Sequence, residues 1–134
     1  DTTRKDMTQA VLEGVLYGLR DSLEVARSLG LSIEKTKICG GGAKSLLWKK
    51  MAANILNVKV EIAKNEEGPA LGGAILAAVG CGEFENVEQA VSKIVKVVET
   101  IEPEKELVEK YEKGYQKFRK IYPALRPVFQ ELAS

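Results

Sequence analysis

The sequence has 134 residues, 45% hydrophobic and 29% charged, which is the composition of one folded domain and excludes a disordered or fibrous chain. Its 20 Lys and Arg residues and 19 Asp and Glu residues leave a net charge of +1, so no long-range field attracts nucleic acid or an anionic membrane surface. Two cysteines occur without any histidine, which excludes the usual Cys/His zinc sites and histidine-dependent catalytic dyads and triads.

Several features bear on the cellular context of the chain. Cys39 and Cys81 are far apart in sequence, and we expect both to be reduced, small, buried residues of a cytoplasmic protein. A single disulfide is the alternative, but no secretory signal accompanies it. The longest apolar run, residues 70–79, is too short and too rich in glycine to span a bilayer. The start at Asp1 without a methionine suggests a chain cut from something longer.

The first predicted element is a long amphipathic helix that ends near Gly30. Thr3 and Asp6 have the spacing of a capping box at its start. Apolar residues then recur at helical spacing, namely Met7, Val11, Val15, Leu19, Leu23 and Ala26.

The next segments predict a strand, a helix and a second strand. Residues 35–39 form a short strand that leads into three glycines, and a helix follows over residues 43–56 with Asn57 as its stop. The buried face of this helix is expected to hold Leu47, Met51 and Ile55. Residues 58–62 alternate between apolar and charged, as in a strand with one covered face. Together these elements predict a βαβ unit with parallel strands.

The second half of the chain predicts helices. Gly68 and Pro69 open a helix of unusually small residues, which should lie close to a neighbour beneath the glycine turn. Further helices are expected over residues 87–98 and 104–122. The last helix carries an aromatic stripe of Tyr111, Tyr115, Phe118 and Tyr122. We expect these rings to pack on the domain rather than to stack nucleobases, because no basic cluster accompanies them.

The most informative segment is the glycine turn within residues 38–45. Glycines leave no Cβ to block a ligand, and the helix that follows offers unpaired N–H groups to a phosphate or ribose oxygen. A Walker loop is a poor match because an alanine, not a glycine, precedes Lys44. A dinucleotide motif is half met by Gly40, Gly42 and Ser45, but the acidic residue expected after the next strand is missing. A tight turn that binds nothing stays open as an alternative.

Three sequence blocks follow one another in a specific order. They are residues 3–14, residues 40–45 with Trp48, and residues 67–74. Together they resemble the carboxy-terminal part of the FGGY carbohydrate kinases over nearly the whole chain. Trp48 and the Glu-Gly-Pro-Ala-Leu-Gly run are most similar to the xylulokinase branch of that family.

The resemblance implies a fold and a nucleotide site. The fold is an α/β, helix-rich, truncated actin-like (ribonuclease H-like) ATPase domain with a small parallel sheet and several helices, and residues 1–134 form a single, incomplete domain. ATP would lie in a cleft between two domains, against the backbone of the turn. The implied nucleotide contacts are Gly40, Gly41, Gly42, Ala43 and Ser45. A frequent family asparagine falls at Leu46, which puts a polar contact there in doubt.

The resemblance also implies what this chain lacks. The amino-terminal part of such kinases supplies the catalytic aspartate, most sugar contacts and the phosphate loops. It would also be the main part that holds the Mg²⁺. We therefore expect no catalytic residue and no metal ligand here, and no activity of the chain alone. The expected partners are ATP, the amino-terminal domain of the same parent chain and a sugar bound through that domain. An open sheet edge and exposed apolar surface would favour homo-oligomers.

The leading functional hypothesis is the ATP-binding carboxy-terminal portion of a kinase that transfers the γ-phosphoryl group of ATP to a pentulose such as xylulose. One alternative is another FGGY kinase, acting on glycerol, gluconate or ribulose. A second is a non-catalytic actin-like nucleotide-binding module, and a third is a helical interaction domain whose glycine turn binds nothing.

Overall fold

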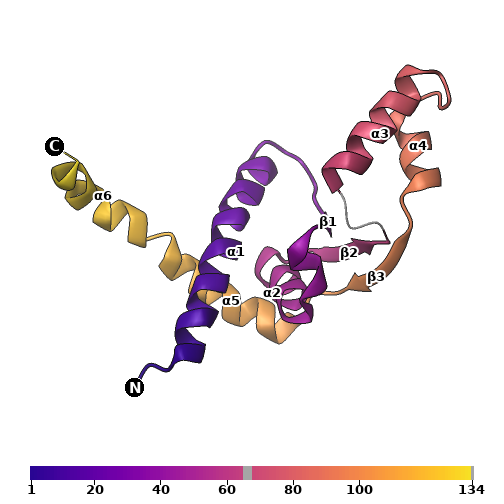
Figure 1. Ribbon diagram of the computed structural model, residues 1–134. Coiled ribbons are helices and arrows are strands. Elements are labelled where there is room, and N and C mark those ends of the chain that lie inside the picture. Colours follow the sequence, from indigo (N-terminus) through magenta and orange to yellow (C-terminus); the bar gives the residue numbers. More distant parts are fainter. Residues whose placement is uncertain (65–67, 134) are drawn as a thin grey trace.

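The computed structural model describes residues 1–64 and 68–133, which form an elongated arrangement of helices around one small sheet (Figure 1). In chain order the elements are α1 (Arg4–Ser28), β1 (Lys35–Ile38), the 3₁₀ helix η1 (Gly41–Lys44), α2 (Leu46–Leu56), β2 (Lys59–Ala63), α3 (Gly68–Gly80), α4 (Val87–Ile94), β3 (Val97–Ile101), α5 (Lys105–Phe118) and α6 (Ile121–Leu132). The α/β, helix-rich class expected from the sequence is confirmed. No helix in the described ranges is long and apolar enough to cross a membrane.

The sheet has three strands in the order β1-β2-β3. β1 and β2 are parallel, with Lys35 opposite Lys59 and Ile38 opposite Ile62, as the predicted βαβ unit requires. β3 is antiparallel to β2, so the sheet is mixed and the expectation of a parallel sheet is wrong. β1 has no strand on its outer side among the described residues.

The third strand replaces the end of a predicted helix. The helix expected over residues 87–98 stops at Ile94, and residues 97–101 pair with β2 instead. Val97, Val98, Thr100 and Ile101 are β-branched, and such side chains favour a strand. The free edge of β2 supplies the hydrogen bonds that an isolated helix end would lack, so the strand forms.

The start of α1 is the predicted capping box. The Thr3 backbone N–H donates to Asp6 Oδ2 at 2.8 Å, and the Asp6 N–H donates to Thr3 Oγ1 at 3.3 Å. The predicted apolar stripe, however, is largely in solvent, since Met7, Val11, Val15 and Leu19 are 62%, 66%, 50% and 52% exposed. Leu23 of the predicted stripe packs against the core, and the other contacts come from a neighbouring face of the same helix, with Leu12, Leu16 and Tyr17.

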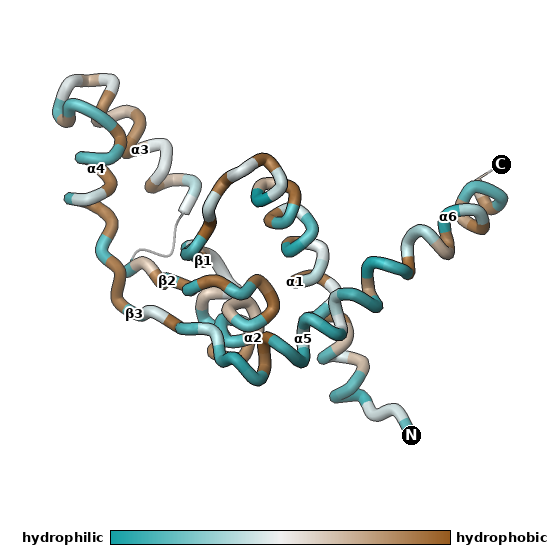
Figure 2. Tube along the Cα trace, turned by 180° about the vertical axis from the view of Figure 1, so that it is seen from behind, coloured by the Kyte–Doolittle hydropathy of each residue, from teal (hydrophilic) through white to brown (hydrophobic). Residues whose placement is uncertain are grey.

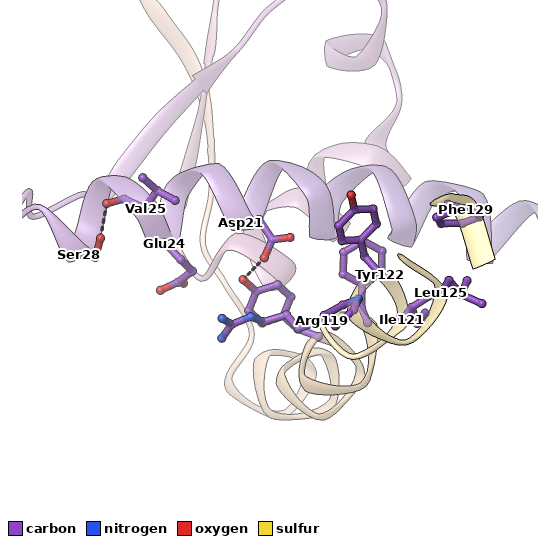
Figure 3. A pocket seen from close by; sticks show the side chains of 12 residues that line it. Asp21, Glu24, Val25, Ser28, Arg119, Ile121, Tyr122, Leu125 and Phe129 are labelled. Carbon is purple, nitrogen blue, oxygen red and sulfur yellow. Dashed lines mark hydrogen bonds between the residues drawn. The ribbon is translucent and has the colours of Figure 1, made fainter. Parts of the chain in front are cut away.

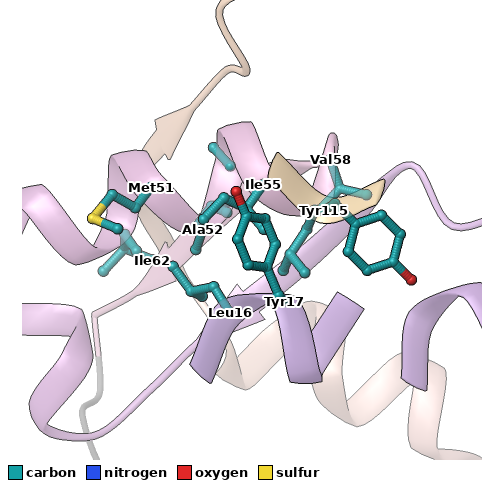
Figure 4. Close-up of a cluster of buried hydrophobic side chains, with 11 residues drawn as sticks. Leu16, Tyr17, Met51, Ala52, Ile55, Val58, Ile62 and Tyr115 are labelled. Carbon is teal, nitrogen blue, oxygen red and sulfur yellow. The ribbon is translucent and has the colours of Figure 1, made fainter. Parts of the chain in front are cut away.

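The hydrophobic core lies where α1, α2, β2 and α5 meet (Figure 4). Its buried members are Leu16, Tyr17, Met51, Ala52, Ala53, Ile55, Leu56, Val58, Val60, Ile62 and Tyr115. Of the predicted buried face of α2, Met51 and Ile55 are confirmed, whereas Leu47 is exposed. Tyr111, Tyr115 and Phe118 pack on the core as expected, but Tyr122 is exposed and contacts Phe129 on α6.

Polar side chains end α2 and connect the neighbouring helices to one another. Asn57 ends the helix in the left-handed conformation, with φ of 50°, which confirms it as the stop. A guanidinium N–H of Arg27 on α1 donates to the Leu56 carbonyl at 3.3 Å. Buried Asn54 accepts a hydrogen bond from the Glu104 N–H at 2.7 Å and so holds the start of α5. The buried Arg20 guanidinium pairs with Glu112, which ties α1 to α5.

α3 and α4 form an arm on the other side of the sheet (Figure 1). The expectation that the small residues of α3 admit a close neighbour is wrong for Gly72 and Gly73, since a Cβ added at either position meets nothing within 4 Å. Cys39 and Cys81 are free thiols as expected, but both are exposed rather than buried. Cys39 follows an edge strand and Cys81 follows the end of α3, and neither position is covered.

Candidate functional site

The glycine turn joins the end of β1 to the start of α2. Gly40 has φ of 75° and ψ of −160°, a conformation that residues with a Cβ rarely adopt. The Ala43 N–H donates to the Gly40 carbonyl at 3.1 Å, and the Ser45 N–H donates to the Gly42 carbonyl at 3.2 Å. These bonds form a compact 3₁₀ turn, so the structure brings together all five predicted nucleotide contacts.

Ser45 ends this turn and begins the following helix. Its Oγ accepts a hydrogen bond from the Trp48 N–H at 3.2 Å, which makes it the N-cap of α2. The helix therefore begins at Leu46 rather than at Ala43. The first N–H groups of α2 have no partner within the helix and give this end a partial positive charge.

Two of the three glycines, Gly40 and Gly42, have a structural reason, and Gly41 has none. Gly40 is required by its positive φ. A Cβ at Gly42 would lie 2.8 Å from Nε1 and 2.9 Å from Cδ1 of Trp48, so Gly42 makes room for the indole ring. Gly41 is exposed, and a Cβ there would meet nothing within 4 Å. Only Gly41 therefore presents bare backbone to the outside without an internal reason for being glycine.

A second helix begins beside the turn. A Cβ at Gly68, the first residue of α3, would lie 2.5 Å from Sγ of Cys39 at the end of β1. The start of the third sequence block therefore lies next to Cys39, the residue that precedes the second block. The amino-terminal ends of α2 and α3 flank the same turn, and helix starts favour anions.

An apolar cavity of about 520 Å³ lies beside the turn, between α1 and the open edge of β1. Its walls include Leu19 and Leu23 of α1, Ile38 and Cys39 of the strand end, and Trp48 of α2. The cavity shows that the face of β1 is not filled by the described residues. The sequence marks Trp48 only through the family resemblance. Its contact with Gly42 was not predicted, because that contact depends on the direction in which α2 leaves the turn.

The turn has the chemistry of a binding site rather than of a catalytic one. Its groups are backbone amides, a hydroxyl and a lysine, and it contains no carboxylate. In the described ranges no group of three or more His, Cys, Asp or Glu side chains is placed to hold a metal ion.

The fold of the chain is similar to that of a solved xylulose kinase from Brucella ovis. The two structures align with a TM-score of 0.83 at 33% identity, over 96% of this chain and 26% of the other. The fold is thus that of an actin-like ATPase domain of the carbohydrate kinases. Residues 1–81 match the C-terminal domain of the FGGY family of carbohydrate kinases. The chain belongs to the FGGY family of carbohydrate kinases.

Curated relatives extend the similarity beyond residue 81. A xylulose kinase of Staphylococcus epidermidis is 39% identical over 130 residues, which are 97% of this chain and 26% of the relative. A xylulose kinase of Bacillus subtilis is 36% identical over 119 residues, 89% of this chain and 24% of the relative. The chain therefore spans about a quarter of the length of these relatives.

Proposed function

We propose that this chain is the ATP-binding carboxy-terminal portion of a cytoplasmic kinase that transfers the γ-phosphoryl group of ATP to a pentulose such as xylulose. The observation that carries the proposal is Gly41, an exposed bare backbone position between the starts of two helices. Two curated relatives that cover most of this chain, those of Staphylococcus epidermidis and Bacillus subtilis, are named xylulose kinases, which supports the pentulose.

The proposed contacts divide between binding and support. The adenosine lies against the backbone at Gly41 and Ala43, where no side chain beyond a methyl group projects. Gly40 and Gly42 act indirectly, by setting the turn and by seating Trp48. Ser45 keeps its oxygen on the Trp48 N–H and can still donate its hydroxyl proton to a ribose or phosphate oxygen.

The remaining parts of phosphoryl transfer are assigned to the rest of the parent chain. The reaction needs an aligned acceptor hydroxyl, a base and Mg²⁺ at the phosphates. In this proposal the amino-terminal domain supplies the base, the sugar contacts and most of the Mg²⁺ ligands, and the present chain alone is inactive. The open edge of β1 and the cavity of about 520 Å³ beneath it are the surface on which that part of the parent packs.

Nucleotide binding can be tested on the chain itself. Titration with ATP and with adenosine, followed by amide resonances, is expected to shift Gly40 through Ser45 with a dissociation constant in the millimolar range or below. Gly41→Leu should abolish these shifts without unfolding the chain, because nothing inside the molecule lies near a Cβ at this position. Gly73→Leu is the matched control, since Gly73 is also exposed with open space around its Cβ. A silent turn at millimolar ligand in the wild-type chain, or equal binding by both variants, would reject the nucleotide site.

Phosphoryl transfer requires a complete enzyme. We suggest replacing the matched segment of the Staphylococcus epidermidis xylulose kinase with this chain and measuring ADP release with xylulose. The proposal predicts an active hybrid whose activity is lost on Gly41→Leu but not on Gly73→Leu. An inactive hybrid, or an equal loss of activity in both variants, would reject the assignment of this chain to such a kinase.

A further inference from the structure

Trp48 joins the glycine turn to two other parts of the molecule. A Cβ at Gly42 would lie 2.8 Å from its Nε1, so the indole ring lies directly against the turn. The same side chain packs on the hydrophobic core and lines the cavity of about 520 Å³ beside β1. Its backbone N–H donates to Ser45 Oγ at 3.2 Å. One residue therefore contacts the turn from the side of the core and also fixes the end of the turn.

The turn has little other support from the described part of the chain. Two backbone hydrogen bonds close the turn on itself. A Cβ added at Gly40 or at Gly41 would meet no described atom within 4 Å, whereas one at Gly42 would meet the ring of Trp48. Consecutive glycines have more backbone freedom than any other residues, so two internal hydrogen bonds leave much of that freedom in place. The contact with Trp48 is what limits the turn from outside.

We infer that Trp48 is a positioning residue for the nucleotide. It holds the backbone at Gly41 and Ala43 in the shape that receives the adenosine, and it acts through Gly42 rather than through a contact with the ligand. A site that is ordered before the ligand arrives binds more tightly, because binding no longer has to order the flexible segment. This inference rests on the proposed function and adds to it a side chain on which the affinity for ATP depends.

Two substitutions of Trp48 separate the ring from its nitrogen. Trp48→Leu removes the ring and is expected to weaken ATP binding about tenfold, which corresponds to the loss of about one hydrogen bond from a misplaced backbone amide. Trp48→Phe keeps an aromatic ring beside Gly42 and should bind ATP within about twofold of the wild type. It removes no internal hydrogen bond, because the indole N–H has no partner among the described residues. Titrations followed by the amide resonances of residues 40–45 measure these affinities.

Phe118 of α5 offers a matched control. Like Trp48, it is a partly buried aromatic residue that packs against the core. It lines a different cavity, of about 610 Å³, between α1 and α6 (Figure 3). Viewed from the front and from behind, α1 stands between α6 and the sheet, so this cavity lies away from the glycine turn (Figures 1 and 2). Phe118→Leu should therefore lower the stability of the core and leave the affinity for ATP unchanged.

The hybrid kinase gives a second measurement that a loss of folded protein cannot imitate. With Trp48→Leu the KM for ATP is expected to rise about tenfold, while the KM for xylulose stays within about twofold of the wild type. A smaller fraction of folded enzyme would instead lower the apparent kcat and change neither KM. Gly42→Ala disturbs the same contact from the side of the turn and should raise the KM for ATP as well. Circular dichroism verifies that each variant is folded.

The outcomes distinguish this inference from the proposed function. A wild-type chain that does not bind ATP would reject the nucleotide site itself. A wild type that binds, together with Trp48→Leu that binds equally well, would reject the role of Trp48 alone. Trp48→Phe that binds as weakly as Trp48→Leu would also overturn the inference, since the ring nitrogen and not the packing would then matter. An equal loss of affinity in Phe118→Leu would show a general loosening of the core instead.

Discussion

The indole ring of Trp48 lies against Gly42, so a methyl group added at position 42 would approach Nε1 to 2.8 Å. Trp48 also packs on the hydrophobic core, and its backbone N–H donates to Ser45 Oγ. The indole ring therefore lies between the core and Gly42. The glycine turn cannot change its shape without moving the first residues of α2. This contact links the glycine turn to the stability of the core.

Alanine at the two adjacent glycines should separate this contact from ligand access. Gly42→Ala must displace the Trp48 ring and is expected to lower the free energy of unfolding by about 1–3 kcal/mol. Gly41→Ala should change it by less than about 0.5 kcal/mol, because its Cβ enters open space. Urea unfolding followed by fluorescence measures both, since Trp48 is the chain's one tryptophan. Equal stabilities would contradict the packing described here.

A second glycine pair tests the contact of α1 with α5. A Cβ at Gly114 would collide with the hydroxyl of Tyr17, which is buried in the core. Gly114→Ala is therefore expected to destabilise the chain by about 1–3 kcal/mol, although alanine is the better helix former. Gly18→Ala on α1, where the Cβ meets nothing, should instead stabilise it by about 0.5–1 kcal/mol. Thermal unfolding should give the two variants melting temperatures on opposite sides of the wild type.

Replacing a buried asparagine and replacing a surface asparagine should lower the free energy of unfolding by different amounts. Asn54 is 2% exposed and accepts from the Glu104 N–H at 2.7 Å, so Asn54→Ala removes the partner of that N–H and leaves a small cavity, at about 2–3 kcal/mol. Asn86 accepts from the Gln89 N–H at 2.8 Å on the surface, where water can replace it, and Asn86→Ala should cost about 1 kcal/mol. Chemical denaturation of both variants decides the order. A larger loss for Asn86→Ala would show that the buried cap has another partner.

Stability is expected to fall in alkaline solution. Burial raises the pKa of Tyr17 and of Tyr115 from 10.0 to about 12, and the hydrogen bond from Tyr115 to Asp21 adds to the second shift. The unfolded tyrosines ionise near pH 10 while the folded ones stay neutral, so their contribution is complete below pH 10 and is lost as the pH rises toward 12.

Phenylalanine variants isolate this effect. Tyr17→Phe cannot ionise in either state and should flatten the fall in unfolding free energy between pH 10 and 12, with little change at pH 7 because its hydrogen bond to the Tyr111 carbonyl is long, at 3.4 Å. Tyr122→Phe on the exposed α6 is the control and should follow the wild-type curve. Denaturant titrations at pH 7, 10 and 11 make the comparison. An identical pH dependence of all three proteins would disprove the role of Tyr17.

The sequence by itself determined the features that depend on neighbours a few residues away. The structure contains the predicted capping box of Thr3 and Asp6, the helix stop at Asn57 and the opening of α3 at Gly68. The strand predicted over residues 58–62 is also present and spans Lys59–Ala63. The glycine turn was also found, because glycines between a strand and a helix have a local cause. Each of these signals acts through hydrogen bonds or backbone angles within one turn of the chain.

The tertiary structure alone decided which surfaces meet. Residues 97–101 form a strand because they pair with the free edge of β2. The sequence of this segment does not indicate where that edge lies. α1 carries apolar residues on two neighbouring faces, and the position of α2 and α5 selected Leu16 and Tyr17 for burial and left Val11 in solvent. The reason for glycine at position 42 likewise appears only once Trp48 is in place, because this contact depends on how α2 packs after the turn.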